Sequence, residues 1–232
     1  MSRELLPFAP SGVDMSRRII RPSPADEVRK MYEDTADSYA QMMDAEIGLP
    51  VYADVLGRLR DRIANTPGAV VDTACGSGHM LSMYHERYDQ EHPLLGVDLS
   101  PRMVSIAEKK LGSNERVAVG DMRDLSFVGS GSSSAVLNFF ALHHLDFEGV
   151  RLGFLEWFRI LAPGGQLVVA TWEGSGAIDY GDESDIVALR YGSDELATWA
   201  QEAGFSITRC DVEPVEDFPM DAVYLEGVKE AT

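Results

Sequence analysis

Cysteine is scarce in this sequence of 232 residues, which contains Cys75 and Cys210 but no Cys-x-x-Cys pair. Two cysteines cannot build a disulfide framework, and their spacing does not supply a four-ligand zinc site. We therefore expect no bound metal. We also expect a protein that works in a reducing compartment, the cytoplasm.

Basic residues and long apolar runs are also few. The chain has 20 lysines and arginines against 38 aspartates and glutamates, a formal net charge of −18 at pH 7. Because such a surface repels phosphate backbones, we expect no nucleic-acid partner. Residues 1–24 hold no apolar stretch of signal-peptide length, and no run approaches the roughly 20 apolar residues of a membrane-spanning helix. We expect no membrane partner.

The composition is otherwise that of an ordinary globular protein, with 45% apolar and 9% aromatic residues. Residues 1–24 contain several prolines and no apolar period, which predicts a mobile N-terminal arm. Residues 25–65 carry apolar side chains at helical spacing, which predicts two amphipathic helices. Ser23 is the expected N-cap of the first helix, and Pro24 follows it at the first helical position. Residues 66–232 complete what we predict to be a single domain.

Short apolar runs alternate with helical patterns beyond residue 66, which predicts an α/β fold. The runs 69–72, 94–98, 117–119, 135–139 and 166–171 predict buried parallel strands joined by helices. Two final β-rich runs, 206–212 and 222–228, predict an antiparallel pair. The expected architecture is a mostly parallel seven-stranded sheet with an antiparallel edge hairpin and helices on both faces.

The first predicted strand ends in the glycine-containing sequence Asp72-Thr-Ala-Cys-Gly-Ser-Gly78. Glycines in such a turn let the backbone approach a ligand, and the amides of the following helix point into the same crevice. Asp98 closes the second predicted strand 20 residues after Gly78, where a carboxylate accepts hydrogen bonds from a ribose diol. A dinucleotide fingerprint would need glycine at Ala74 and His79, and Asp72 would repel a diphosphate while attracting an ammonium group. The pattern favours an adenosyl ligand, although the loop alone fits an ordinary βα turn equally well.

Five motifs occur in the order typical of one family: VDTACGSG at 71–78, GVDLSPRM at 96–103, GDM at 120–122, ALHHL at 141–145 and LAPGG at 161–165. Over about residues 25–230 the chain resembles the class I S-adenosylmethionine-dependent methyltransferases. The resemblance implies a Rossmann-like fold, S-adenosylmethionine as cofactor, a cofactor-binding segment over 66–232 and a lid formed by the helices of 25–65.

The same resemblance assigns individual cofactor contacts. The loop from Asp72 to Gly78, including Gly76, holds the methionine part, and Asp98 holds the ribose hydroxyls. Ala74 stands where the family usually has glycine, which implies a tightened or shifted methionine pocket. The remaining assigned contacts are Tyr32 and Tyr39 from the lid, Leu99 and Met103 at one adenine face, Asp121 and the Met122 backbone at the adenine edge, and Asn138 and Phe139 facing the methyl-transfer position.

Three residues are candidates for catalysis. His143 is suited to take a proton near neutral pH, although this paired-histidine position commonly packs internally in the family. Asn138 and Tyr180 are placed to assist by hydrogen bonding and by an aromatic face near a sulfonium. Tyr180 lies in an acidic stretch after the fifth strand, where aromatics interleaved with carboxylates suit a cationic or amine-bearing ligand, although a solvated loop explains the same composition.

The sequence thus predicts a transferase that methylates a small-molecule acceptor, in the biosynthesis of specialised metabolites. Residues 138–141 lack the Pro-Pro-aromatic signature of enzymes that methylate base amino groups, which argues against DNA and RNA substrates. The alternative is a cyclase that consumes S-adenosylmethionine alone and forms azetidine-2-carboxylate and methylthioadenosine. A catalytically silent cofactor-binding module is a third, less favoured interpretation.

Overall fold

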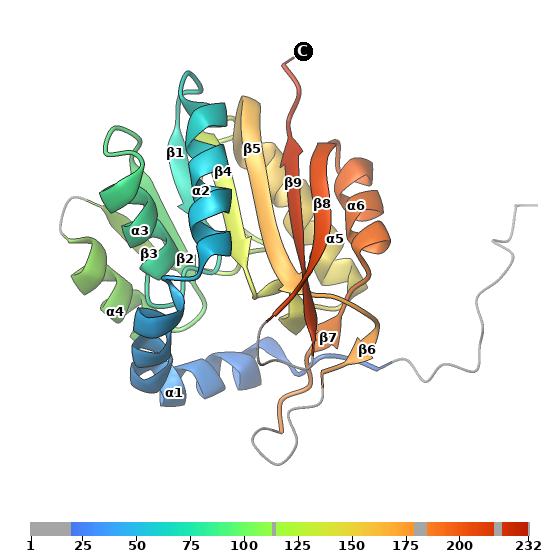
Figure 1. Ribbon diagram of the computed structural model, residues 1–232. Coiled ribbons are helices and arrows are strands. Elements are labelled where there is room, and N and C mark those ends of the chain that lie inside the picture. Colours follow the sequence, from blue (N-terminus) through green and yellow to red (C-terminus); the bar gives the residue numbers. More distant parts are fainter. Residues whose placement is uncertain (1–19, 113–114, 179–184, 216–219, 232) are drawn as a thin grey trace, which may run out of the picture.

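The computed structural model describes residues 20–112, 115–178, 185–215 and 220–231. It confirms the predicted sheet, whose strand order is β3-β2-β1-β4-β5-β9-β8 (Figure 1). Neighbours from β3 to β5 are parallel, and β9 runs antiparallel to both β5 and β8. The strands are β1 (Ala69–Asp72), β2 (Leu94–Asp98), β3 (Arg116–Val119), β4 (Ser133–Phe139), β5 (Leu161–Trp172), β8 (Ser206–Pro214) and β9 (Asp221–Val228), and a separate pair is formed by β6 (Gly176–Ala177) and β7 (Leu189–Arg190).

Helices cover both faces of the sheet, as the sequence predicts. One hydrophobic core lies under α5, which buries Phe154 and Trp157, and the other lies under α2 and α3, which bury Leu56 and Tyr84. Because both faces are covered, the central strands β1, β2 and β4 are buried almost throughout. The helices are α1 (Ala25–Glu46), α2 (Pro50–Ile63), α3 (His79–Arg87), α4 (Pro101–Leu111), α5 (Phe147–Ile160) and α6 (Ser193–Glu202), with a short 3₁₀ helix at Leu142–His144.

Helix α1 crosses the edge of the sheet at which the parallel strands end (Figure 1). Side-chain contacts hold it there: Asp37 pairs with Arg102 of α4 at 2.8 Å, and Asp44 lies 2.7 Å from His79 at the start of α3. Lys110 of α4 also reaches Asp44, at 3.2 Å. These contacts place α1 over the segments that follow β1 and β2.

The predicted N-cap of α1 is wrong. Pro24 occupies the cap position and provides no side-chain hydrogen bond to the helix. The Ser23 hydroxyl instead accepts a hydrogen bond from the Val187 amide at 3.0 Å, and the Ser23 amide donates to the Val187 carbonyl at 2.8 Å. A tertiary pairing has therefore taken the hydroxyl that local sequence assigns to the helix.

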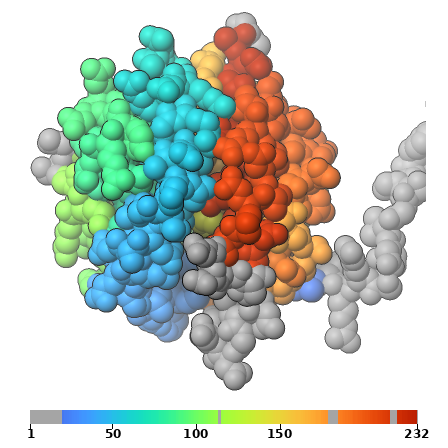
Figure 2. All heavy atoms as spheres, in the orientation of Figure 1, coloured from blue at the N-terminus to red at the C-terminus, as the bar shows by residue number. Residues whose placement is uncertain are grey.

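A buried carboxylate on β9 anchors helix α2 to the sheet. Glu226 of β9 accepts hydrogen bonds from Arg58 and Arg62 of α2, each at 2.6 Å, and Arg209 of β8 lies 3.6 Å away. Figure 2 shows the resulting surface, on which the blue α1–α2 layer adjoins the red surface of β8 and β9. Among the residues that the structure describes, no helix has the length and apolar character required to cross a bilayer.

Candidate functional site

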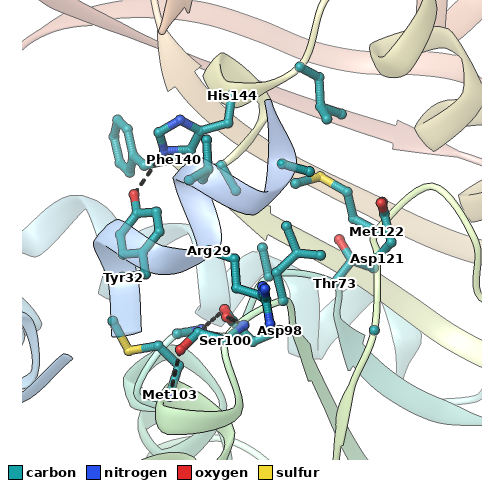
Figure 3. Close-up of a pocket in the computed structure, with 18 of the residues that line it drawn as sticks. Arg29, Tyr32, Thr73, Asp98, Ser100, Met103, Asp121, Met122, Phe140 and His144 are labelled. Atoms are coloured by element: carbon teal, nitrogen blue, oxygen red, sulfur yellow. Dashed lines mark hydrogen bonds between the residues drawn. The ribbon is translucent and has the colours of Figure 1, made fainter. Parts of the chain in front are cut away.

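A cavity that we call the Asp98 cavity lies at the carboxyl ends of β1, β2 and β4, against α1 (Figure 3). Ligands of open α/β sheets bind at this edge, outside the strand ends. The structure brings together here most of the residues predicted to contact the cofactor. They are Tyr32 and Tyr39 from α1, Ala74 and Gly76 from the glycine loop, Asp98, Leu99 and Met103 after β2, Asp121 and Met122 after β3, and Phe139 from β4.

The glycine loop needs its glycines for two separate reasons. Gly76 and Gly78 have φ of 50° and 82°, in the left-handed region that side chains rarely adopt. A Cβ at Gly76 would lie 3.3 Å from the Tyr39 ring, and one at Gly78 would lie 3.1 Å from the Cβ of Ala107 in α4. The loop therefore packs between α1 and α4, and its residues Ala74 and Gly76 line the Asp98 cavity.

Asp98 is held in place by backbone amides. Its two oxygens accept hydrogen bonds from the Gly76 and Ser100 amides, both at 2.9 Å. Ser100 in turn caps α4, because its hydroxyl accepts from the Met103 amide at 3.2 Å. Burial raises the pKa of Asp98, while the two amide bonds oppose the rise. A carboxylate has about four acceptor positions, so Asp98 keeps capacity for the hydroxyls of a ligand.

The Asp121 carboxylate, in the wall of the Asp98 cavity, is paired with Arg123. Arg123 Nε lies 2.9 Å from one carboxylate oxygen and Arg123 Nη2 lies 2.5 Å from the other. Burial favours the neutral acid, but the Arg123 bonds prevail and the pKa of Asp121 is lowered. The neighbouring Met122 carbonyl accepts a hydrogen bond from Trp157 Nε1 at 2.9 Å. Both predicted adenine-edge residues thus line the cavity in fixed positions.

Helix α1 contacts the loop after β4 through Tyr32 and His144. The Tyr32 hydroxyl lies 2.9 Å from His144 Nε2 (Figure 3). The Tyr32 and Tyr39 rings pack edge to face, with centroids 5.9 Å apart. Burial lowers the pKa of His144 to about 4, so this ring is neutral near pH 7. No feature of the sequence distinguishes His144 from His143, because the two are adjacent in one motif.

A second cavity, which we call the aromatic cavity, adjoins the first and has a volume of about 650 Å³. Tyr32, Tyr39, Ala74, Phe139 and Phe140 line both cavities. Sequence reasoning missed most of its walls, because they come from distant elements that carry no shared motif. The missed residues include Glu46 from α1, Tyr52 from α2, His79 from α3, Trp172 from β5, Glu213 from β8 and Tyr224 from β9, whereas Asp72, Ser77 and His143, which the sequence did place at the site, also line this cavity.

Phe140 is strained at the boundary between the cavities. Its φ of 49° lies in the left-handed region, which is uncommon for a bulky residue. Its ring packs against Trp172 at 4.8 Å and against Tyr224 at 6.5 Å, and its amide donates to the Ala170 carbonyl at 2.7 Å. The strained backbone turns an aromatic side chain into the wall shared by both cavities.

The catalytic candidates from the sequence have different fates. His143 lines the aromatic cavity, is buried, and its Nδ1 has no hydrogen-bond partner within the described residues. Asn138 is fully buried and lies among the residues of neither cavity wall; its amide donates to Thr73 Oγ1 at 3.0 Å and lies 3.5 Å from Met122 Sδ. Tyr180 lies outside the described residues. Catalytic roles for all three stay predictions.

Asp72 is the most perturbed carboxyl group at the site. It is buried at the tip of β1, lines the aromatic cavity and accepts a hydrogen bond from the Ala74 amide at 3.2 Å. Burial raises its pKa to about 7, with a smaller upward contribution from the charge of Asp98. A buried group of this kind is stabilised in its charged form by a cation, which is the partner the sequence predicted for it.

Comparison with known proteins agrees with the geometry. Residues 70–165 match the model of a family described as a methyltransferase domain. A demethylmenaquinone methyltransferase of Deinococcus radiodurans is 31% identical over 112 residues, which are 47% of this chain and 45% of that protein. A mouse protein named probable tRNA methyltransferase 9B is 28% identical over 165 residues, 70% of this chain and 31% of its own length. This chain thus spans less than half the length of either relative.

A solved structure shows the same fold over nearly the whole chain. The 1,6-didemethyltoxoflavin-N1-methyltransferase of Burkholderia thailandensis, with bound 1,6-didemethyltoxoflavin and S-adenosylhomocysteine, has a TM-score of 0.69 and 18% identity, covering 96% of this chain and 100% of that one. The family match over residues 70–165 and the shared fold agree with the predicted resemblance to the class I S-adenosylmethionine-dependent methyltransferases.

Proposed function

We propose that the protein transfers a methyl group from S-adenosylmethionine to a small-molecule acceptor, in the biosynthesis of a specialised metabolite in the cytoplasm. The observation that carries the proposal is the pair of adjoining cavities, one containing the amide-held Asp98 carboxylate and the other large enough for an acceptor. The buried location and free thiol of Cys75 and the free thiol of Cys210 support a reducing compartment.

The residues of the Asp98 cavity fit an adenosyl group. Asp98 has acceptor capacity for the ribose hydroxyls, and the glycine loop exposes backbone where a Cβ at Gly76 would crowd Tyr39. Asp72, buried and without a cationic side chain among its described hydrogen-bond partners, suits the ammonium of the methionine part. When bound, S-adenosylmethionine supplies an electrophilic methyl group on its sulfonium. The protein's part is then to orient the acceptor and to exclude water.

We assign to His143 the removal of a proton from the acceptor. Burial, with the neighbouring His144, lowers the pKa of His143 well below its ordinary value, so its ring is neutral near pH 7 and is a weaker base than a free imidazole. His144 packs against it with ring centroids 4.1 Å apart, which restricts the orientation of the His143 ring. Asn138 acts indirectly in this scheme, by fixing Thr73 and Met122 in the wall of the Asp98 cavity.

The acceptor is proposed to be cationic or amine-bearing. Besides Asp72, which is assigned to the methionine ammonium, the carboxylates of Glu46 and Glu213 line the aromatic cavity, and no lysine or arginine belongs to its described lining. Such a wall disfavours anions, including nucleic-acid phosphates. The volume of the cavity also favours an acceptor-dependent reaction over internal cyclisation of S-adenosylmethionine, which needs no second site.

Calorimetry tests the binding step. We expect S-adenosylmethionine and S-adenosylhomocysteine to bind with one-to-one stoichiometry, and NAD to show no heat of binding. Binding of NAD in place of S-adenosylmethionine would contradict the assignment of the glycine loop.

A further inference from the structure

The aromatic cavity is walled by side chains that form a nearly continuous set of ring contacts. Tyr52 and Phe139 pack edge to face at 6.0 Å, and Phe140 contacts Trp172 and Tyr224. These rings come from α2, β4, β5 and β9, four elements that converge only in the folded protein. Aromatic faces carry partial negative charge, so a cluster of them attracts cations as well as planar apolar groups.

Three phenols and a carboxylate share one part of this cavity. Tyr39, Tyr52 and Tyr224 all line it, and Tyr52 is close enough to each of the other two for their charges to interact. Glu46, at the end of α1, acts electrostatically on both Tyr39 and Tyr52. Burial raises the pKa of Tyr52 to about 12, so its hydroxyl remains protonated. Phenol oxygens and a carboxylate are all acceptors for the N–H groups of an ammonium ion.

We propose that the aromatic cavity binds an aromatic amine as its cation, with the ring against Phe140 and Trp172 and the ammonium group among Tyr39, Tyr52, Tyr224 and Glu46. This inference rests on the proposed function for its biological meaning: after the bound ammonium group has lost a proton to solvent, the freed nitrogen lone pair would take the methyl group, and S-adenosylhomocysteine would be the leaving group. The cavity adjoins the Asp98 cavity through Tyr39 and Phe139, so an amine held there lies next to the cofactor site.

Three indole probes with two-carbon side chains test the proposal. Tryptamine is a cation, tryptophol a neutral isostere and indole-3-acetate an anion, and each is titrated by calorimetry into the protein saturated with S-adenosylhomocysteine. We expect tryptamine to bind about tenfold tighter than tryptophol, as cation–π attraction in a desolvated site would give, and indole-3-acetate to bind most weakly. Equal affinities for the three probes would overturn the proposal.

Charge reversal at Glu46 tests whether the ammonium group binds at the position proposed for it. Because Glu46 is exposed at the cavity rim, Glu46→Lys should leave the fold intact. It should reduce the preference for tryptamine over tryptophol by about fivefold or more. Glu27→Lys makes the same change on the same helix, at an exposed residue that lines neither cavity, and should leave the preference unchanged.

The two proposals fail in different ways. Binding of S-adenosylhomocysteine without a preference for tryptamine overturns only this inference. Failure of S-adenosylhomocysteine to bind overturns the proposed function, and the tryptamine preference is then measured on the free protein. If Glu46→Lys weakens S-adenosylhomocysteine binding as strongly as tryptamine binding, Glu46 belongs to the cofactor site and the assignment of the ammonium position is wrong.

Discussion

Burial in the fold favours the neutral form of Asp72, whereas the ammonium group of the proposed ligand favours its ionised form. Burial raises its pKa to about 7, whereas an unfolded chain has an aspartate pKa of about 3.9. The folded state therefore holds this proton more tightly, and ionisation costs stability progressively as pH rises from about 4 to about 7. A shift of this size corresponds to a cost of about 4 kcal/mol at neutral pH, as an order of magnitude.

Asp72→Asn removes that cost while keeping an oxygen that can accept from the Ala74 amide. If half of the cost is recovered, the Tm of the ligand-free protein at pH 7.5 should rise by about 4–8 °C. The same substitution should weaken S-adenosylmethionine binding, because the ammonium group loses its counter-charge. Thermal unfolding measures the first effect and calorimetry the second.

The pH dependence of binding follows from the same pKa. At pH 6 about one tenth of the free protein has Asp72 ionised, and at pH 7 about half does, so the affinity for S-adenosylmethionine should rise about fivefold over this interval. Asp72→Asn should flatten most of the rise. An affinity that is constant from pH 6 to 7, or an Asp72→Asn variant that keeps the full slope, would refute the reasoning.

Three further predictions concern the rest of the site and its support. Asp98→Ala should weaken S-adenosylmethionine binding by about 1–3 kcal/mol, because the ribose hydroxyls lose their acceptor. The calorimetric control is Asp124→Ala, in the loop after β3 and outside both cavities. An equal loss of affinity in both variants would contradict the assignment of Asp98 to the ribose. Glu226→Gln should lower the free energy of unfolding, measured in urea, by about 2 kcal/mol. The loss is smaller than the roughly 3–5 kcal/mol of a fully buried ion pair because the Arg58 side chain is one-third exposed. An unchanged urea midpoint would show that the arginines do not depend on this charge. Ligand binding should slow amide hydrogen exchange in Ala25–Glu46, because this helix lines both cavities and is held by partly exposed ion pairs. Unchanged exchange in this helix would contradict its predicted role as a lid.

The parts that the sequence predicted well are those set by local chemistry. The apolar runs located the strands because buried parallel strands must be apolar on both faces. Ser100 caps α4 as Ser-Pro predicts, and Gly76 and Gly78 adopt the left-handed conformations that a tight turn requires. Asp98 also lies where its spacing from the glycine loop places it, in the wall of the cavity.

The parts that the sequence could not predict depend on packing between distant segments. Ser23 has the residue type of a helix cap, but its hydroxyl pairs with Val187, more than a hundred residues away. Asn138 lies at the end of its strand as expected, yet its side chain turns toward Thr73 rather than into a cavity. The contribution of Tyr224 to the aromatic cavity depends on the antiparallel register of β9 with β5, which no local motif encodes.

Mass spectrometry of the adenosine-containing products distinguishes methyl transfer from internal cyclisation of S-adenosylmethionine. The protein is incubated with S-adenosylmethionine alone and with S-adenosylmethionine plus an amine acceptor such as tryptamine. We expect S-adenosylhomocysteine and a methylated amine, formed in equal amounts and only when protein and acceptor are both present. Protein-dependent formation of methylthioadenosine and azetidine-2-carboxylate without any acceptor would contradict it.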